Sequence, residues 1–542
     1  MDNDDNTNNN HKNDDASSVT NESGRTRLLG TLAGIGNNCN NMIGVGIFSS
    51  PGLVLSEINS PGIALILWLV GGIAALFGSL SYLGSSIPEG GGETVYLKRA
   101  FPRPRALFSY MFSFSMIVAI RPASMCAIAN VFAQYFLYLI KATERCDINY
   151  LHPTGYLNNW EFWQLRLCSL AAVLIIAIYH VLSNKWANRI NQSLTIIKML
   201  TLLVISIIGL ATIPQFINDE NTNWKNMFPV EMTISASTLT AALIPILFAY
   251  NGWNNLNYTL DEFVNPQEKL FISNSISVII VTFLYLCANI AYTNVPLSKI
   301  TGKSEPSEII AGRFAFKVGG FGLAHALSFF VCLSAFGALA ANTWAGSRVI
   351  VAAAKRNYFP FSSWFQKWNT KTDTPVFALI AQTFWCSLII IFYPHNDPFK
   401  FFIKLGQHCM WVFLFLSTLG LLFLRYTKPK LRRPFRVLTI IPVIFILFAL
   451  FIIIGSFVND SDKDTTFSYY PYVVSLVVIG VGTICWYILY WLGCQLISKP
   501  RVPRSHNDDG SSLHTSGDDE ERRTVVPISI EDRTDTFDSR NF

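Results

Sequence analysis

The chain has 542 residues, of which 51% are hydrophobic and only 14% are Asp, Glu, Lys or Arg. Soluble proteins carry about 25% of these charged residues, and the mean hydropathy here is +0.35. The composition excludes an ordinary soluble domain and indicates a membrane protein. The formal charge of +6 is therefore interpreted loop by loop, and we expect no nucleic-acid partner.

Polar segments begin and end the chain. Residues 1–24 and 499–542 contain few apolar residues, so they predict disordered tails. A spanning helix needs about 20 apolar residues, and twelve segments between the tails approach or exceed this length: 28–55, 62–87, 106–140, 165–183, 190–214, 234–258, 270–295, 318–352, 375–394, 400–425, 437–458 and 470–496. We therefore expect an all-α polytopic membrane protein in which residues 25–498 form one twelve-helix domain. The two longest of the later segments, 106–140 and 318–352, are expected to tilt or to extend beyond the bilayer.

The short loops predict the orientation, because loops rich in Lys and Arg stay in the cytoplasm. Most of these residues follow the second, fourth, eighth and tenth segments, which places both termini in the cytoplasm. A minority lies on the opposite side: Lys299, Lys303, Arg313 and Lys317. The expected location is the plasma membrane, with the Golgi or another internal membrane as the alternative.

The first apolar segment is interrupted in its middle by "GIGNNCNNMIGVGIFSSPG", residues 34–52. Glycine weakens a helix, and lipid offers no partners to asparagine amides. Unwound backbone at membrane depth is tolerated where it lines a cavity. A half-helix that starts near Gly44 would present free N–H groups and a positive dipole end, which suits a carboxylate.

The sixth segment carries a matching interruption within "LIPILFAYNGWNNLNYTLDEFVNPQEKL", residues 243–270. Its unwound carbonyls, from Phe248 to Asn251, could accept hydrogen bonds from an ammonium group. Paired interruptions at corresponding positions of two halves indicate a transporter site. The two breaks together predict a zwitterionic α-amino acid as ligand, and the alternative is a pair of kinked structural helices.

Lys198 lies nine residues past Arg189 in the fifth segment. At about 1.5 Å per residue it is roughly 13 Å along the helix, near mid-membrane if Arg189 marks the cytoplasmic edge. A lysine at that depth costs at least about 2.5–3.5 kcal/mol, so it needs a partner or a role unless its side chain reaches the interface. Burial disfavours the charged form of lysine, so Lys198 could load and release a proton.

Several stretches together resemble the motifs of one family. They are "MIGVGIF" (42–48), "YLGSSIPEGGGETVYLKRAFP" (82–102), "IRPASMCAIANVFAQY" (120–135), "FAYNGWNNLNYTLDEFVNP" (248–266), "SRVIVAAAKRNYFP" (347–360), "DTPVFAL" (373–379) and "LRYTKPKLRRPFRV" (424–437). In this order they resemble the L-type amino acid transporters of the amino acid–polyamine–organocation superfamily, especially stand-alone fungal members such as methionine permeases. The resemblance covers about residues 27–456. It implies a five-plus-five inverted repeat with broken helices 1 and 6, and two added C-terminal helices.

The resemblance also implies the residues of the site. The substrate carboxylate would lie over Ile43, Gly44, Val45 and Gly46, and the ammonium would meet carbonyls of Phe248, Ala249 and Asn251. Phe248 matches an aromatic gate, with a core-facing or lipid-facing Phe as the alternative, and Asn254 matches a polar residue that supports the unwound segment. Candidates for the side-chain pocket are Ala123, Ser124, Ala127, Trp344, Met410 and Trp411.

Three expectations about this site follow. Val45 stands where the family has Ser or Thr, so backbone N–H groups alone would hold the carboxylate. A side chain at Gly46 is expected to occupy the place of the carboxylate without disturbing the fold. No charged residue is placed in the side-chain pocket, where Met410 and Trp411 suit a large apolar or thioether side chain.

Lys198 matches a lysine whose ammonium takes the place of a sodium ion in sodium-coupled relatives. The resemblance therefore implies sodium independence. We predict proton coupling, with a fixed structural cation as the alternative.

The predicted function is secondary transport of large neutral L-amino acids, such as methionine and leucine, by alternating access. The alternatives are an exchanger, or a transporter-like receptor with little flux. "PEGGGE" has no strand before it and no GK[ST] after it, and no HExxH or GxSxG occurs, so we expect no nucleotide site, enzyme activity, cofactor or metal.

The expected partners are the amino acid, membrane lipid and a co-transported proton. The cysteine that links heteromeric animal members to a glycoprotein has no clear match, so no covalently linked accessory subunit is expected. Lys12 is the only lysine of the N-terminal tail and the predicted ubiquitin acceptor.

Overall fold

The computed structural model describes twelve stretches of the chain: residues 31–83, 92–104, 106–141, 159–218, 223–229, 234–258, 266–296, 309–393, 397–427, 429, 437–458 and 469–491. Both predicted tails, including Lys12, lie outside these residues. Within them the regular structure is helical, apart from one isolated bridge between Asn369 and Thr374. This agrees with the all-α prediction.

The helices follow the predicted apolar segments. The first segment forms α1 (Thr31–Met42) and α2 (Gly46–Ile58), and the second forms α3 (Pro61–Leu83). The remaining helices and turns are α4 (Glu93–Ala100), α5 (Leu107–Ser115), the π-helical turn η1 (Met116–Ile120), α6 (Arg121–Lys141), α7 (Asn159–Leu182), α8 (Asn184–Phe216), η3 (Trp224–Asn226), α9 (Ala236–Ala249), η4 (Asn255–Tyr258), α10 (Pro266–Tyr292), α12 (Ile310–Lys355), α13 (Ser362–Phe365), α14 (Val376–Phe392), α15 (Pro398–Thr427), α16 (Ile440–Gly455) and α17 (Tyr470–Trp491).

Among the described residues, eight helices are long and apolar enough to cross a membrane, or nine when α1 and α2 count as one bent span. Three further apolar helices, α9, α14 and α16, are shorter. They coincide with the sixth, ninth and eleventh predicted segments. The broken first span is thus present, while the count of twelve spans stays a prediction.

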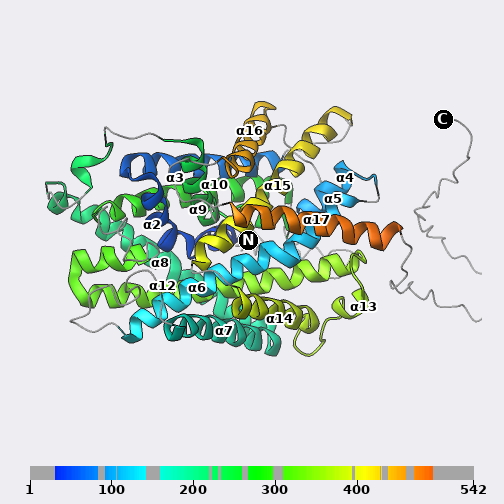
Figure 1. Cartoon of the computed structure of the whole chain (residues 1–542), viewed down its shortest axis with the longest axis horizontal. Helices are drawn as coiled ribbons and strands as arrows, with labels where there is room; N and C mark the ends of the chain where they lie inside the picture. The colour runs from blue at the N-terminus through cyan, green and yellow to red at the C-terminus, as the bar shows by residue number, and fades with distance from the viewer. Residues whose placement is uncertain are drawn as a thin grey trace, which may run out of the picture. The chain divides into compact units, whose positions relative to one another are not determined.

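Two groups of helices surround the breaks. In one group α2 and α3 pack on α9, and α1 and α3 pack on α10. In the other, α6 packs on α7, α12 and α15, while α14 lies on α7 and α12. Figure 1 shows α7 and α14 side by side at one edge, with α3 and α16 toward the opposite edge. Helix α8 contacts both α10 and α12 and so joins the groups.

Local irregularities occur in the two longest predicted segments, within 106–140 and at the start of 318–352. Helix α12 is kinked at Gly319 and Gly320, and Gly320 has φ +65°, a conformation that glycine adopts without steric cost. The segment 106–140 becomes α5 and α6 with the π-helical turn η1 between them. Such turns are frequent at functional sites, and this one lies beside the cavity described next.

Candidate functional site

The break in the first span creates a helix start inside the protein. Helices α1 and α2 are bent by 43° around it. Helix α2 begins at Gly46, and the side chain of the preceding residue, Val45, makes no capping hydrogen bond. The first N–H groups of a helix have no partner within it and form its positive end. This start is therefore suited to bind an anionic group.

The break in the first span touches the end of α9 and the turn after it, where the break in the sixth span is predicted. A Cβ added at Gly46 would lie 2.5 Å from the Cα of Ala249, and one added at Gly252 would lie 2.8 Å from the carbonyl oxygen of Asn41. Gly252 also has φ +114°, which disfavours any side chain there. The expectation that Gly46 faces only ligand space is wrong, because its missing side chain allows α2 to contact the end of α9.

Tyr285 of α10 links the two breaks. Its buried hydroxyl lies 2.8 Å from the carbonyl oxygen of Met42 and 2.9 Å from that of Ala249. These carbonyls end α1 and α9. The carbonyl of Ala249, one of those predicted to receive the ammonium, thus shares the single proton of this hydroxyl with the carbonyl of Met42, and a second lone pair is left.

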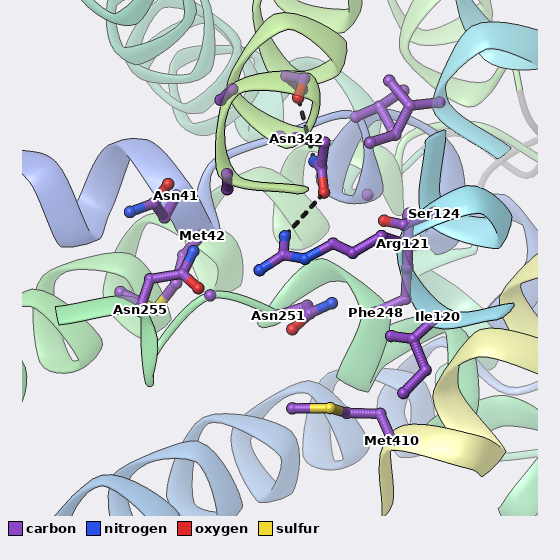
Figure 2. Close-up of a pocket in the computed structure, with 18 of the residues that line it drawn as sticks. Asn41, Met42, Ile120, Arg121, Ser124, Phe248, Asn251, Asn255, Asn342 and Met410 are labelled. Atoms are coloured by element: carbon purple, nitrogen blue, oxygen red, sulfur yellow. Dashed lines mark hydrogen bonds between the residues drawn. The ribbon is translucent and has the colours of Figure 1, made fainter. Parts of the chain in front are cut away.

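A cavity of about 70 Å³ lies at the breaks (Figure 2). This is several times the volume that one water needs. Eight of the predicted site residues line it, from four different spans: Gly44, Val45, Gly46, Ser124, Phe248, Asn251, Asn254 and Met410. The structure therefore brings the predicted carboxylate, ammonium and pocket positions together around one space.

Six other predicted residues do not line this cavity: Ile43, Ala123, Ala127, Ala249, Trp344 and Trp411. Ile43, Ala123 and Ala127 are buried in the core, and Ala123 packs against Gly406 of α15. Trp411 instead lines a smaller neighbouring cavity of about 10 Å³, shared with Asn251 and Met410.

Trp344 takes part in a different cluster. Its indole N–H donates to the side-chain oxygen of Asn184 at 3.4 Å, and the guanidinium of Arg348 lies 3.4 Å from its ring centroid. The indole therefore joins the start of α8 to α12 instead of lining the cavity.

Arg121 is a cavity residue that sequence reasoning missed. It opens α6 directly after the π-helical turn, and its guanidinium donates to the Oδ1 of Asn342 at 3.2 Å. Figure 2 shows Arg121 between Asn342 and Asn251. The expectation of a pocket without charged residues is wrong, because this cation lines it. The "IRPAS" motif contains Arg121, but the sequence does not predict which face of the helix this residue occupies.

Lys198 is buried at mid-helix in α8, with 1% of its surface exposed. Its ammonium donates to the carbonyl oxygen of Asn40 in the last turn of α1. Cations are favoured at a helix C-terminus, where carbonyl groups lack helical partners. The lysine thus has a polar partner beside the first break.

Phe248, the predicted gate residue, has 8% of its surface exposed, and its ring meets that of Phe399 edge to face at 6.0 Å between centroids. Both rings come from helices that border the cavity region, α9 and α15. The described residues include no group of three or more His, Cys, Asp and Glu side chains placed to hold a metal ion.

A polytopic helical protein with a cavity between a broken first span and the end of a later helix, α9, is consistent with a secondary transporter. The comparison with protein families agrees: a model described as amino acid permease matches residues 29–482. The chain belongs to this amino acid permease family. It is accordingly a multi-pass integral membrane protein that transports amino acids, and it is not an enzyme.

Named relatives cover most of the chain. It is 31% identical over 485 residues to the large neutral amino acids transporter small subunit 2 of Mus musculus, across 87% of this chain and 82% of that protein. It is 29% identical over 466 residues to the Asc-type amino acid transporter 1 of Mus musculus, across 85% and 80%. It is 29% identical over 441 residues to the cystine/glutamate transporter of Homo sapiens, across 80% and 81%.

Proposed function

We propose that the chain carries large neutral L-amino acids, with methionine and leucine as first candidates, by alternating access. The observation that carries this proposal is the cavity at the meeting of the two breaks, lined by both backbone segments and by Met410. The relative named for large neutral amino acids supports the same substrate class. Methionine side chains are flexible and polarizable, so Met410 can adapt to thioether or branched side chains.

The zwitterion is placed across the cavity. The carboxylate lies over the start of α2, where Gly44, Val45 and Gly46 line the cavity. The ammonium lies toward the carbonyls at the end of α9, where Phe248 and Asn251 line it. Anions are stabilised at helix N-termini and cations at C-termini, so the two half-helices orient the amino acid.

Arg121 sharpens the proposed selectivity. The guanidinium of Arg121 on the cavity wall repels the cationic side chains of lysine and arginine. Because Asn342 accepts a hydrogen bond from it, the guanidinium does not need a charged substrate as its partner. An amino acid with an anionic side chain is the second candidate, favoured by this guanidinium and by the relative named for cystine and glutamate.

The proposed architecture has twelve spans, with α9, α14 and α16 counted as the shorter ones and both termini in the cytoplasm. Spans 1–5 and 6–10 form the inverted repeat, and α16 and α17 are the two added helices. In this arrangement Lys198 supplies the cation beside the first break, so transport is sodium-independent and coupled to protons. Plasma-membrane location and action without a covalently linked subunit belong to the same proposal.

Uptake of labelled methionine in cells that lack their own transporters tests the function. We expect saturable uptake that unlabelled leucine reduces, that glutamate reduces less, and that lysine leaves unchanged. Glutamate as the best competitor would select the second candidate. Saturable binding to the purified protein without uptake would select the receptor alternative, and faster efflux with external methionine would identify an exchanger.

A further inference from the structure

Glu93 is a buried acid next to the candidate site, and it has no role in the transport proposed above. None of its surface is exposed. It is the first residue of α4, after Gly92 with φ +53°, and α4 packs on α5 and α15. A carboxylate buried inside a membrane protein is costly and indicates a function.

The partner of Glu93 is a residue of the sixth-span break. The side-chain amide of Asn254 donates a hydrogen bond to the Oε1 of Glu93. Asn254 lines both the main cavity and its smaller neighbour. One amide side chain thus connects the carboxylate to the wall of the substrate cavity.

Asn254 also organises the unwound backbone around it. Its carbonyl accepts hydrogen bonds from the backbone N–H of Asn257 at 3.0 Å and from the side chain of Asn257 at 3.1 Å. These bonds form the turn that starts η4. The contact with Glu93 therefore fixes a folded piece of backbone and not only one side chain.

Aromatic rings add a second connection between α4 and the break. Tyr96, one turn after Glu93 in α4, lies 5.3 Å from Tyr82 of α3, and Tyr82 lies 5.2 Å from Trp253 (centroid distances). Trp253 directly precedes Asn254. The segment α4 is therefore connected to the turn after α9 by a hydrogen bond to a carboxylate and by a series of edge-to-face and tilted ring contacts.

The position of α4 indicates which side of the cavity it covers. The exposed residues Lys98 and Arg99 belong to its last turn, and the helix packs beside Gly420, near the Arg425 end of α15. Loops and helix ends rich in such residues lie in the cytoplasm.

We propose that Glu93 is a positioning residue that holds Asn254 and the unwound sixth span against α4, and that this contact closes the cytoplasmic side of the cavity. It rests on the proposed function, because it assigns a gate to that transport cycle. Hydrogen bonds to a charged group are about twice as strong as neutral ones. Loss of the contact lets Asn254 leave the cavity wall, which weakens amino acid binding and opens the cytoplasmic side too readily.

Two isosteric changes test the contact in purified protein reconstituted into liposomes, with labelled methionine as the probe. In Asn254→Asp two carboxylates face each other in a buried site and repel. In the double variant Glu93→Gln, Asn254→Asp the donor and acceptor are exchanged, so the hydrogen bond can form again. We expect Asn254→Asp to raise the half-saturation concentration about tenfold or more, and the double variant to return within about threefold of wild type.

The control is Glu57→Gln, the same chemical change at a partly buried residue of α2 that does not line the cavity. It should leave the half-saturation concentration unchanged. The proposal would be overturned if the half-saturation concentration of the double variant were as high as that of Asn254→Asp alone. It would also be overturned if Glu93→Leu inserted normally and had the same half-saturation concentration as wild type.

Thermal unfolding of the wild type, Asn254→Asp, Glu93→Gln and the double variant separates this proposal from the substrate assignment. The two single changes should be strongly non-additive even if methionine is not the substrate, since the contact exists without ligand. Additive effects on the unfolding temperature would refute the contact itself. Absence of methionine uptake by wild type, together with non-additive unfolding, would refute only the neutral substrate class.

Discussion

The break in the first span and the turn after α9, where the break in the sixth span is predicted, meet at the cavity, but their neighbours hold them by opposite charges. The first break has a cationic partner, Lys198, which donates to the carbonyl oxygen of Asn40. The sixth break has an anionic partner, Glu93, which accepts from the amide of Asn254. A carbonyl that ends a helix suits a cation, and an amide donor suits an anion. A backbone carbonyl of the first break thus binds a cation, and a side-chain amide of the sixth binds an anion.

The two breaks also differ in their neutral contacts. Asn38 of the first span donates to Asn274 at 3.2 Å and to Ser277 at 2.6 Å, both on α10, and Ser273 of α10 donates to the carbonyl oxygen of Thr31. Helix α1 is therefore bound to α10 along its length. The turn after α9 is bound from two sides, because Asn38 of α1 also donates to the carbonyl oxygen of Trp253 at 3.5 Å and Asn254 donates to Glu93 of α4, a short helix between the second and third spans. This turn therefore joins α1 to α4.

The largest expected effect comes from forcing the two breaks apart. Gly46→Leu places a side chain where Ala249 lies within 2.5 Å, and overpacking of this kind costs about 1–3 kcal/mol or more. We expect uptake to be abolished and delivery to the membrane reduced, measured by labelled uptake and by surface labelling. Gly36→Ala is the control, because nothing lies within 4 Å of its added Cβ. Normal delivery and uptake in Gly46→Leu would show that the breaks do not touch.

The charge at the first break gives the second largest effect. Lys198→Met should abolish transport or remove its pH response, because the carbonyl of Asn40 loses its cationic donor. In wild type we expect uptake to rise as external pH falls and to be unaffected when choline replaces sodium. Lys198→Arg keeps a donor that does not release its proton, so residual uptake in it should be independent of pH. A clear sodium requirement would contradict the assignment of Lys198.

A moderate effect is expected at Arg121, the cation of α6 that lines the cavity. Arg121→Gln should let lysine inhibit methionine uptake, which lysine leaves unchanged in wild type, because the repelling charge is gone. Competition curves measure it. Arg99→Gln, at an exposed residue of α4, is the matched control. Equal lysine inhibition in wild type and Arg121→Gln would mean that the guanidinium does not face the substrate.

The smallest effect concerns the start of α2. Val45 lines the cavity but has no hydrogen-bond donor in its side chain. Val45→Thr, which has the same shape, and Val45→Ser should both lower the half-saturation concentration, since a hydrogen bond to a charged group contributes about 1.5–3 kcal/mol at most. Kinetics of methionine uptake decide it. An unchanged value in both variants would place the carboxylate elsewhere.

Much of the fold could be predicted because membrane helices must satisfy their own backbone groups. Long apolar segments leave little alternative to helices, and the clusters of Gly, Pro and Asn mark where a helix cannot continue. The break at Gly46 therefore falls where the sequence predicts it, and α9 ends at Ala249, within the interruption predicted for the sixth span. The place of Lys198 near the middle of its helix was likewise predictable, because nine residues separate it from Arg189 and each adds a fixed helical rise.

The side chains that line the cavity were harder to predict. Ser124 and Met410 line it, whereas Ala123, Ala127 and Trp344 do not. Which face of α6 meets the cavity depends on the π-helical turn just before it, because such a turn alters the 3.6-residue period. Arg121 enters the cavity for the same reason.

The sequence by itself determined the membrane-protein class, the apolar segments and the two breaks, since these follow from composition and from local backbone preferences. Only the tertiary structure decided that Gly46 contacts Ala249, that Arg121 lines the cavity and that Glu93 binds Asn254. These contacts join residues far apart in the chain, from 161 positions between Glu93 and Asn254 to 221 between Arg121 and Asn342. No local pattern encodes such pairs, because each depends on the phase and tilt of two helices that pack together only in the folded protein.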